Sequence, residues 1–220
     1  MKIKSVYSQN ILYYIAILSG LYFFVIACNP GNQEELPILG NSIIEKNPEG
    51  KSDTLYHQVA NFKLIDQDSL EVTEKDFADK IYVADFFFTS CPTICPIMKS
   101  EMLRVYEAFK DHDEVQLISH TIDPVHDTIP LLNSYAERLG VEGPKWRFVT
   151  GTQEEIYDLG QGSYMVSAGE DKLSPGGFMH SGAFILVDKK KRIRGVYDGT
   201  KEEQVSRLIK DIDVLLKEYQ

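Results

Sequence analysis

An apolar run over residues 81–88 leads directly to two cysteines, Cys91 and Cys95, and this junction constrains the fold more than any other part of the chain. The run suits a central strand that is covered on both faces. Beyond Cys95, apolar residues recur at helical spacing, and Pro96 fits the first position of a helix. The sequence therefore predicts a strand that delivers two thiols to the entry of a helix, with residues 91–95 as an exposed entry turn.

Further patterns predict an α/β domain around this junction. Hairpins and single strands are expected at 62–73, 115–122, 146–149 and 183–197. Helices are expected from about 96, over 129–139 with a stop at Gly140, from a capping box at 152–155, and over 205–219. This order predicts a thioredoxin-like fold, in which a central mixed sheet is flanked by helices and carries an N-terminal hairpin addition.

The spacing of the two cysteines suits two kinds of chemistry. Residues four positions apart can lie on one face of a first helical turn, so the sulfurs of Cys91 and Cys95 can form a disulfide or bind one soft metal ion. The N–H groups at a helix start favour thiolate over thiol, as both chemistries require. A buried, inert role is the alternative, and the flanking prolines at a strand-to-helix junction argue against it.

A third metal ligand is expected at His180, just before an apolar strand at 183–187. In a thioredoxin-like fold the loop at this point faces the cysteine turn. Two thiolates and one imidazole suit Cu(I), and with a further ligand they suit Cu(II). The alternative is a histidine that merely packs in a loop.

Together these motifs resemble the Sco/SenC family. The resemblance rests on Cys-Pro-x-x-Cys-Pro at 91–96, Asp-Pro-x-x-Asp-Thr at 123–128 and His-Ser at 180–181, and it extends from about residue 56 to the C-terminus. It implies a membrane-tethered copper-binding metallochaperone that helps to build the binuclear copper centre of cytochrome c oxidase subunit II. Such a protein delivers one copper ion, reduces the cysteines of its target, or does both, and that target is subunit II or another copper protein.

The resemblance assigns roles to three residues only. It implies that Cys91, Cys95 and His180 are the metal ligands and that the two cysteines are also a redox-active pair. The carboxylates of Asp123 and Asp127 are expected to stabilise a turn and a helix start. Many family members have Asp before the histidine, where this chain has Met179, so an acid near the metal is not expected at that position.

Two residues near these motifs have alternative interpretations. His120 lies near the end of a predicted strand and is either a structural imidazole or a neighbour of the metal. Met179 is either packed in its loop or a soft axial ligand.

An enzyme is the alternative function. An extracytoplasmic thiol-disulfide oxidoreductase would use Cys91 and Cys95 catalytically, and His180 distinguishes the two functions because a dithiol reductase needs no imidazole facing its thiols. A peroxidase fits less well, since no arginine lies close in sequence to Cys91.

The N-terminus indicates export and a membrane anchor. Lys2 and Lys4 precede an uncharged apolar stretch over 11–27, and the run Val-Ile-Ala-Cys ends at Cys28. This pattern predicts a signal peptide at 1–27 and a lipid on Cys28, with an uncleaved anchor as the alternative. Both alternatives tether the protein to a membrane of the cell envelope, with its domain in the periplasm or otherwise outside the cytoplasm. A flexible linker is expected over 28–53 and the folded domain over 54–220.

Charge and cysteine content agree with this location. The formal net charge is −10, and the one tight basic cluster, at 189–192, is expected to be a turn between strands, so nucleic acid is not expected as a partner. The chain has three cysteines. Lipidation of Cys28 would leave an even pair, as is usual in an oxidising compartment.

Overall fold

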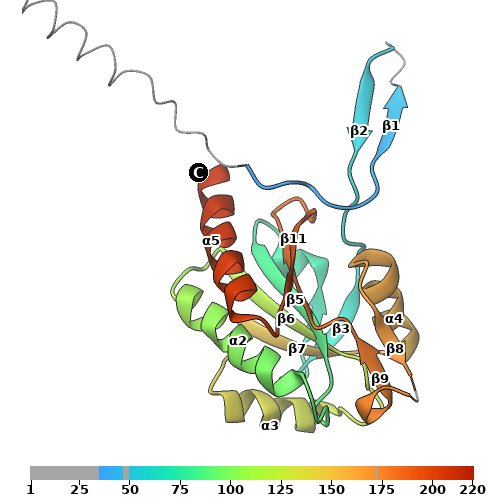
Figure 1. Cartoon of the computed structure of the whole chain (residues 1–220), viewed down its shortest axis with the longest axis vertical. Helices are drawn as coiled ribbons and strands as arrows, with labels where there is room; N and C mark the ends of the chain where they lie inside the picture. The colour runs from blue at the N-terminus through green and yellow to red at the C-terminus, as the bar shows by residue number, and fades with distance from the viewer. Residues whose placement is uncertain (1–34, 47–49, 172) are drawn as a thin grey trace, which may run out of the picture. The chain divides into compact units, whose positions relative to one another are not determined.

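The computed structural model of the chain describes residues 35–46, 50–171 and 173–220 (Figure 1). The side chains of Pro175 and His180 also lie outside the described part. One compact unit spans Glu35–Gln220. The predicted signal peptide and Cys28 lie outside the described residues, and within the described part no helix is long and apolar enough to cross a membrane.

A mixed sheet of seven strands forms the centre of this unit, in the order β11-β10-β5-β6-β7-β3-β4. The strands are β3 (Lys63–Asp66), β4 (Glu71–Thr73), β5 (Ile81–Phe87), β6 (Val115–Thr121), β7 (Trp146–Thr150), β10 (Ala183–Val187) and β11 (Ile193–Asp198). β5, β6 and β7 are parallel neighbours, whereas β10 pairs with β5 in the antiparallel sense. Every residue of β5 and β6 is buried, as expected for central strands covered on both faces.

In the described part of the chain, four α-helices and three shorter helical turns cover the sheet. The α-helices are α2 (Cys95–Phe109), α3 (Ile129–Leu139), α4 (Gln153–Asp158) and α5 (Glu202–Glu218), and the short turns are η1 (Glu74–Phe77), η2 (Leu159–Ser163) and η3 (Pro175–Gly177). Their ends follow the sequence signals: α3 stops at Gly140, which adopts φ 67°, and a complete capping box joins Thr152 and Glu155 at the start of α4. The predicted α/β, thioredoxin-like architecture is confirmed.

The helices form two layers. In Figure 1, α2, α3 and α5 lie on one side of the sheet and α4 lies on the other. Consecutive right-handed crossovers from β5 through α2 to β6, and from β6 through α3 to β7, place both of these helices on the same face. The C-terminal ends of β5 and β6 therefore meet the N-terminal ends of α2 and α3 at one edge of the domain.

Two small sheets were not predicted. β1 (Ile43–Lys46) pairs with β2 (Ser52–Leu55), and all of their residues are exposed. This hairpin lies mostly within the range 28–53 for which the sequence predicts a flexible linker. β8 (Ala168–Glu170) pairs with β9 (Phe178–His180) in the loop region before β10.

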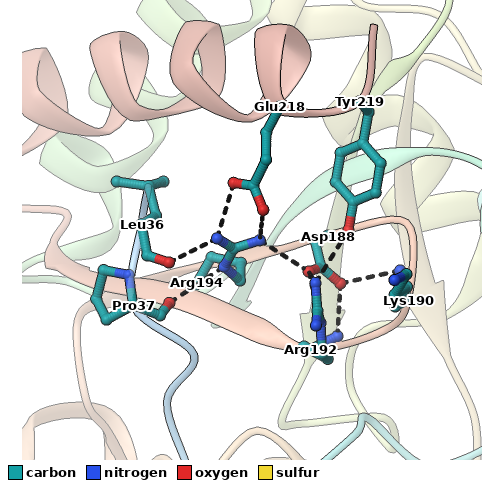
Figure 2. A network of polar contacts seen from close by, with 8 residues as sticks. All are labelled: Leu36, Pro37, Asp188, Lys190, Arg192, Arg194, Glu218 and Tyr219. Atoms are coloured by element: carbon teal, nitrogen blue, oxygen red, sulfur yellow. Dashed lines mark hydrogen bonds and ion pairs between the residues drawn. The ribbon is translucent and has the colours of Figure 1, made fainter. Parts of the chain in front are cut away.

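A cluster of charged groups fastens the start of the compact unit to its end (Figure 2). Arg194 of β11 donates to the carbonyl oxygens of Leu36 and Pro37, at 2.6 and 3.1 Å. The same guanidinium donates to Asp188 at 3.1 Å and to both carboxylate oxygens of Glu218, at 2.9 and 2.8 Å. We call these five residues the Arg194 cluster. It holds the segment at 36–37 against the last turn of α5, far along the chain.

Candidate functional site

Both cysteines of the predicted motif lie between the end of β5 and the first residue of α2. Cys91 is 7% exposed and Cys95 is 2% exposed, and both are thiols. Of the residues between them, Pro92 and Thr93 are exposed and Ile94 is partly buried, so the prediction of an exposed turn is wrong for the two sulfur-bearing residues. The hydroxyl oxygen of Thr93 lies 3.7 Å from the sulfur of Cys91.

Burial affects the two thiols differently. At Cys91 burial opposes ionisation, but hydrogen bonds with the backbone of Thr93 and Cys95 and with their side chains outweigh it and lower the pKa of the thiol. At Cys95 burial dominates and raises the pKa to about 12, against the opposing effects of a hydrogen bond with the Phe88 backbone and of the Lys99 charge. Cys91 is therefore the more easily ionised sulfur, and Cys95 is the one that holds its proton.

A buried carboxylate fixes the approach to the cysteine turn. Asp127 is fully buried; it accepts hydrogen bonds from the backbone N–H of Thr89 at 3.0 Å and from the hydroxyl groups of Thr89 and Thr121, the latter at 2.5 Å. These bonds join the ends of β5 and β6. The prediction that Asp127 caps a helix is therefore wrong, because its side chain bonds outside α3. Asp123 does stabilise a turn, since its side chain accepts from the N–H of His126 at 3.3 Å.

The loop that carries His180 packs against the cysteine turn. The Phe178 and Phe88 rings lie 5.1 Å apart between centroids. A Cβ atom at Gly176 would lie 2.8 Å from the Phe88 ring and 3.4 Å from Pro92, and one at Gly182 would lie 3.4 Å from Ile94. The two glycines therefore bring the backbone on both sides of His180 close to the residues around Cys91.

The backbone of His180 is defined by β9, where it pairs with Ala168. Its side chain lies outside the described part, so its position relative to the sulfurs stays a prediction. Among the described residues, no three His, Cys, Asp or Glu side chains come together as a metal site. Met179 is 46% exposed, so the expectation of a packed methionine is wrong, and its role as an axial ligand stays a prediction.

His120 is a structural imidazole. It is fully buried on the α4 side of the sheet, stacked on Phe86 at 4.7 Å between centroids and next to Tyr164 at 5.3 Å. Its Nδ1 lies 3.3 Å from the carbonyl oxygen of Asp85. Burial lowers the pKa of His120 to about 4, because the ring leaves water and the carbonyl compensates only partly. The imidazole is therefore neutral at physiological pH.

On the opposite face, beneath the cysteines, lies a second charged cluster that the sequence did not predict. The Lys99 ammonium donates to the carboxylate of Asp85 at 2.6 Å and to the hydroxyl of Ser119 at 3.0 Å. Ser119 in turn donates to Asp85 and accepts from the Trp146 indole at 2.9 Å. We call these four residues the Lys99 cluster. The sequence contained one sign of this cluster: Asp85 interrupts the apolar pattern of the strand, and Lys99 interrupts that of the helix.

A cavity of about 330 Å³ connects the cysteines with this cluster. Its lining includes Cys91 and Cys95, the Lys99 side chain and, from α3, Tyr135 and Arg138. Arg138 lies over the Tyr135 ring, with 5.4 Å between its guanidinium carbon and the ring centroid. The sulfurs thus adjoin a recess that has two cationic side chains and one phenol in its wall.

Comparisons with known proteins agree with this arrangement. The SCO1/SenC family model matches residues 50–217. A SCO1/SenC family lipoprotein from Bacillus anthracis superposes with a TM-score of 0.66 at 26% identity, over 73% of this chain and 95% of that one. BsSco, described as a member of the Sco family of cytochrome c oxidase assembly proteins with a disulfide switch, gives a TM-score of 0.64 at 26% identity, over 72% and 93% of the two chains.

A relative with its metal in place gives a similar result. The copper-bound ScoI of Bradyrhizobium japonicum superposes with a TM-score of 0.58 at 27% identity, over 70% of this chain and 98% of that one. The family model covers well over half of the chain, and it includes the cysteine turn, the loop with His180 and the whole central sheet. The chain therefore belongs to the SCO1/SenC family.

Proposed function

We propose that this protein is a membrane-tethered copper-binding metallochaperone that assists assembly of the binuclear copper centre of cytochrome c oxidase. One observation carries the proposal: two buried thiols lie on a turn against which the loop with His180 is packed through Gly176 and Phe178. The family resemblance supports it, since the related ScoI of B. japonicum has a structure with copper bound and BsSco belongs to oxidase assembly proteins.

The donor set fits a single copper ion. Cys91, Cys95 and His180 would hold it, and two soft sulfurs with one imidazole match the preference of Cu(I). Bound copper would supply a soft Lewis-acidic centre that can pass to a target site and that, as Cu(II), can accept an electron. The protein's part begins with Cys91, whose lowered pKa makes it the first thiolate available to a metal.

Metal binding by Cys95 would require this thiol to lose its proton. Because burial raises its pKa to about 12, Cys95 keeps its proton in the metal-free protein and must lose it when it becomes a ligand. Metal binding is therefore coupled to proton release at Cys95. The Lys99 charge favours this release, since it lowers the pKa of Cys95.

A thiol-disulfide oxidoreductase is the second candidate function. The unequal acidity of Cys91 and Cys95 favours it, because a more acidic attacking sulfur beside a protonated partner suits disulfide exchange. The disulfide switch of BsSco points the same way. In the cell both activities would serve one target, by reducing its cysteines and then supplying copper.

His180→Ala distinguishes these two functions. It removes one proposed ligand and leaves both thiols in place, so we expect copper affinity to fall by more than the 10–100-fold typical of a residue that only supports a ligand. Disulfide formation between Cys91 and Cys95 should persist. Unchanged copper affinity with lost reductase activity would instead favour the oxidoreductase. Oxidase assembly in cells carrying the variant should decline and recover partly with added copper.

The N-terminal part of the proposal concerns location. We propose that residues 1–27 are removed as a signal peptide, that Cys28 carries a lipid, and that the domain works outside the cytoplasm. The related B. anthracis protein is a lipoprotein, which supports this assignment. Mass spectrometry of membrane-extracted protein tests it. Retention of Lys2 together with an unmodified Cys28 would replace the lipid by an uncleaved anchor.

A further inference from the structure

The β1–β2 hairpin exposes apolar side chains on both of its faces. Ile43 lies opposite Leu55 on one face, and Ile44 lies opposite Thr54 on the other. Together with Tyr56, which directly follows β2, the apolar side chains of the hairpin are between 45% and 70% exposed. A two-stranded hairpin is at best marginally stable in water, and apolar side chains that stay exposed as a group mark an interaction site. We therefore expect a binding partner to cover this hairpin.

The hairpin starts from the edge of the domain that lies opposite the cysteines. Val187, the last residue of β10, pairs with Tyr82 near the start of β5, whereas Cys91 follows the end of β5. The turn after β10 therefore lies at the opposite edge from the cysteine turn. Arg192 of this turn places its guanidinium carbon 6.0 Å from the centroid of the Tyr56 ring, at the base of the hairpin. In Figure 1 the hairpin projects from the domain at the end opposite α3 and β9.

The turn beside the hairpin is the one tight basic cluster of an acidic chain. Lys189 and Arg192 are paired with carboxylates. Lys190 is exposed, and Lys191 donates to the neutral side chain of Asn61 at 2.9 Å, so the turn keeps positive charge at its surface. Lysines next to isoleucine and tyrosine are the combination that suits a membrane interface, where basic groups meet phosphate and apolar groups enter the boundary of the acyl chains.

The N-terminal chain leads to this same edge. The compact unit begins at Glu35, seven positions after Cys28, so the chain between them can span at most about 25 Å. The Arg194 cluster then holds residues 36–37 against the last turn of α5. Arg192 donates to Tyr219 at that end of α5, at 3.2 Å. A lipid on Cys28 would therefore keep this edge, and not the cysteine edge, close to the bilayer.

We propose that the β1–β2 hairpin and the turn at 188–192 form a membrane-facing surface that lies on the lipid bilayer. Ile43, Ile44 and Leu55 enter the interface, and Lys190 and Lys191 contact the phosphate groups of the lipids. A bilayer can surround both apolar faces of a hairpin, whereas a flat protein surface would cover one. The inference rests on the membrane tether of the proposed function and adds an orientation to it, because the cysteine edge then points away from the bilayer.

Quenching of tryptophan fluorescence by brominated lipid acyl chains tests this orientation. Mature protein is purified from membranes with its anchor and inserted into vesicles of phosphatidylcholine and phosphatidylglycerol, with or without bromine on the phosphatidylcholine chains. Trp146 is the chain's one tryptophan and is fully buried, so it gives a constant background. We expect the additional emission of Ile44→Trp to fall by about half in brominated vesicles, as for a side chain in the interface.

Val125→Trp is the matched control. Val125 is also exposed, but it lies in the loop after β6, at the cysteine edge. Its additional emission should be the same with and without bromine. Equal emission of Ile44→Trp in the two kinds of vesicle, or equal quenching at both positions, would overturn the proposal. The first result would leave a protein partner as the cover of the hairpin.

A second pair of variants tests the apolar side chains themselves. In protein carrying Ile44→Trp, the added changes Ile43→Asn and Leu55→Asn should abolish most of the quenching, because they remove the apolar group beside the reporter. Ile97→Asn removes an exposed apolar side chain in the first turn of α2 and should leave the quenching unchanged. Quenching that survives both asparagine changes in the hairpin would contradict the proposal.

The outcomes separate this inference from the proposed function. No copper is present, so a failure of copper binding leaves the result intact. Protein that does not float with the vesicles would overturn the membrane tether and this inference together. Protein that floats with the vesicles while Ile44→Trp stays unquenched would overturn the inference alone.

Discussion

The Arg194 cluster and the Lys99 cluster contain the same kind of interaction and use it differently. Both place a basic side chain that is nearly inaccessible to solvent against a buried carboxylate, Asp85 or Asp188, and Arg194 also binds the partly exposed Glu218. Arg194 donates through five hydrogen bonds, two of them to backbone carbonyl oxygens, and so joins chain segments that are distant in sequence. Lys99 donates through two, and the rest of its surroundings are aromatic rings and a cavity.

The difference follows from the two side chains. A guanidinium is a rigid planar fork that can satisfy several acceptors at once, whereas an ammonium is a compact point charge. The Arg194 cluster is therefore suited to holding the start of the domain against α5. The Lys99 cluster is suited to presenting a charge to its neighbours. A buried ion pair therefore indicates a function only where one of its two charged groups still faces a cavity, as Lys99 does.

Removal of Arg194 should have the largest effect on stability. Arg194→Met leaves the carboxylate of Glu218 without its partner, while Asp188 keeps Arg192 at 2.7 Å. Because the Glu218 side chain is 25% exposed, water can replace part of the lost interaction, and we expect the free energy of unfolding to fall by about 2–3 kcal/mol through the lost hydrogen bonds of the guanidinium. Urea denaturation followed by circular dichroism measures this. A free energy of unfolding equal to that of the parent protein would contradict this role of Arg194.

His120 differs from both clusters, because it is a buried titratable group that stays neutral. Its pKa of about 4 in the folded protein lies below the ordinary value of 6.5, so its contribution to stability is complete above pH 6.5 and is lost as the pH falls toward 4. Between pH 7 and pH 5 we expect a loss of about 2 kcal/mol from this residue. Denaturation at both values, compared with His120→Phe, measures it. An equal loss in the variant would contradict the assignment.

Two neighbouring glycines test the packing at the site itself. Gly176 and Gly177 have φ of 83° and 85°, so alanine at either position should cost about 1 kcal/mol of backbone strain. Only at Gly176 would the new Cβ also collide with the Phe88 ring, at 2.8 Å; at Gly177 the space is open. We expect Gly176→Ala to lower copper affinity about tenfold, or about 1.4 kcal/mol, and Gly177→Ala to change it less than twofold. Equal effects of the two variants on copper affinity would mean that the close packing of Gly176 against Phe88 does not influence the metal site.

The sequence predicted the parts of the fold that depend on local patterns. The apolar run before Cys91, the proline at the start of α2 and the capping box at Thr152 all appear where expected. The exposed β1–β2 hairpin was missed, because neither strand has a buried face that would leave an alternating pattern. The burial of the cysteines was missed because Phe88 and the distant loop at 176–178 come together only in the folded chain.

The two ionic clusters could not be predicted for the same reason. Lys99 pairs with a residue fourteen positions away, and Arg194 pairs with carbonyl groups more than 150 positions away. A charged residue in an apolar pattern shows that a partner is needed, but it does not identify the partner. For the candidate site, sequence motifs identified Cys91 and Cys95, whereas Asp127 and Lys99 gained their roles only from the structure.

A copper titration of the same protein in two redox states tests most directly whether Cys91 and Cys95 are copper ligands in their reduced form. The full chain with Cys28→Ser is titrated once as the dithiol and once as the Cys91–Cys95 disulfide, with bound metal measured after removal of excess. We predict one equivalent of tightly bound copper in the reduced protein and none in the oxidised protein, because both states use the same two sulfurs. Equally tight copper binding by the fully oxidised protein would mean that Cys91 and Cys95 are not the principal copper ligands.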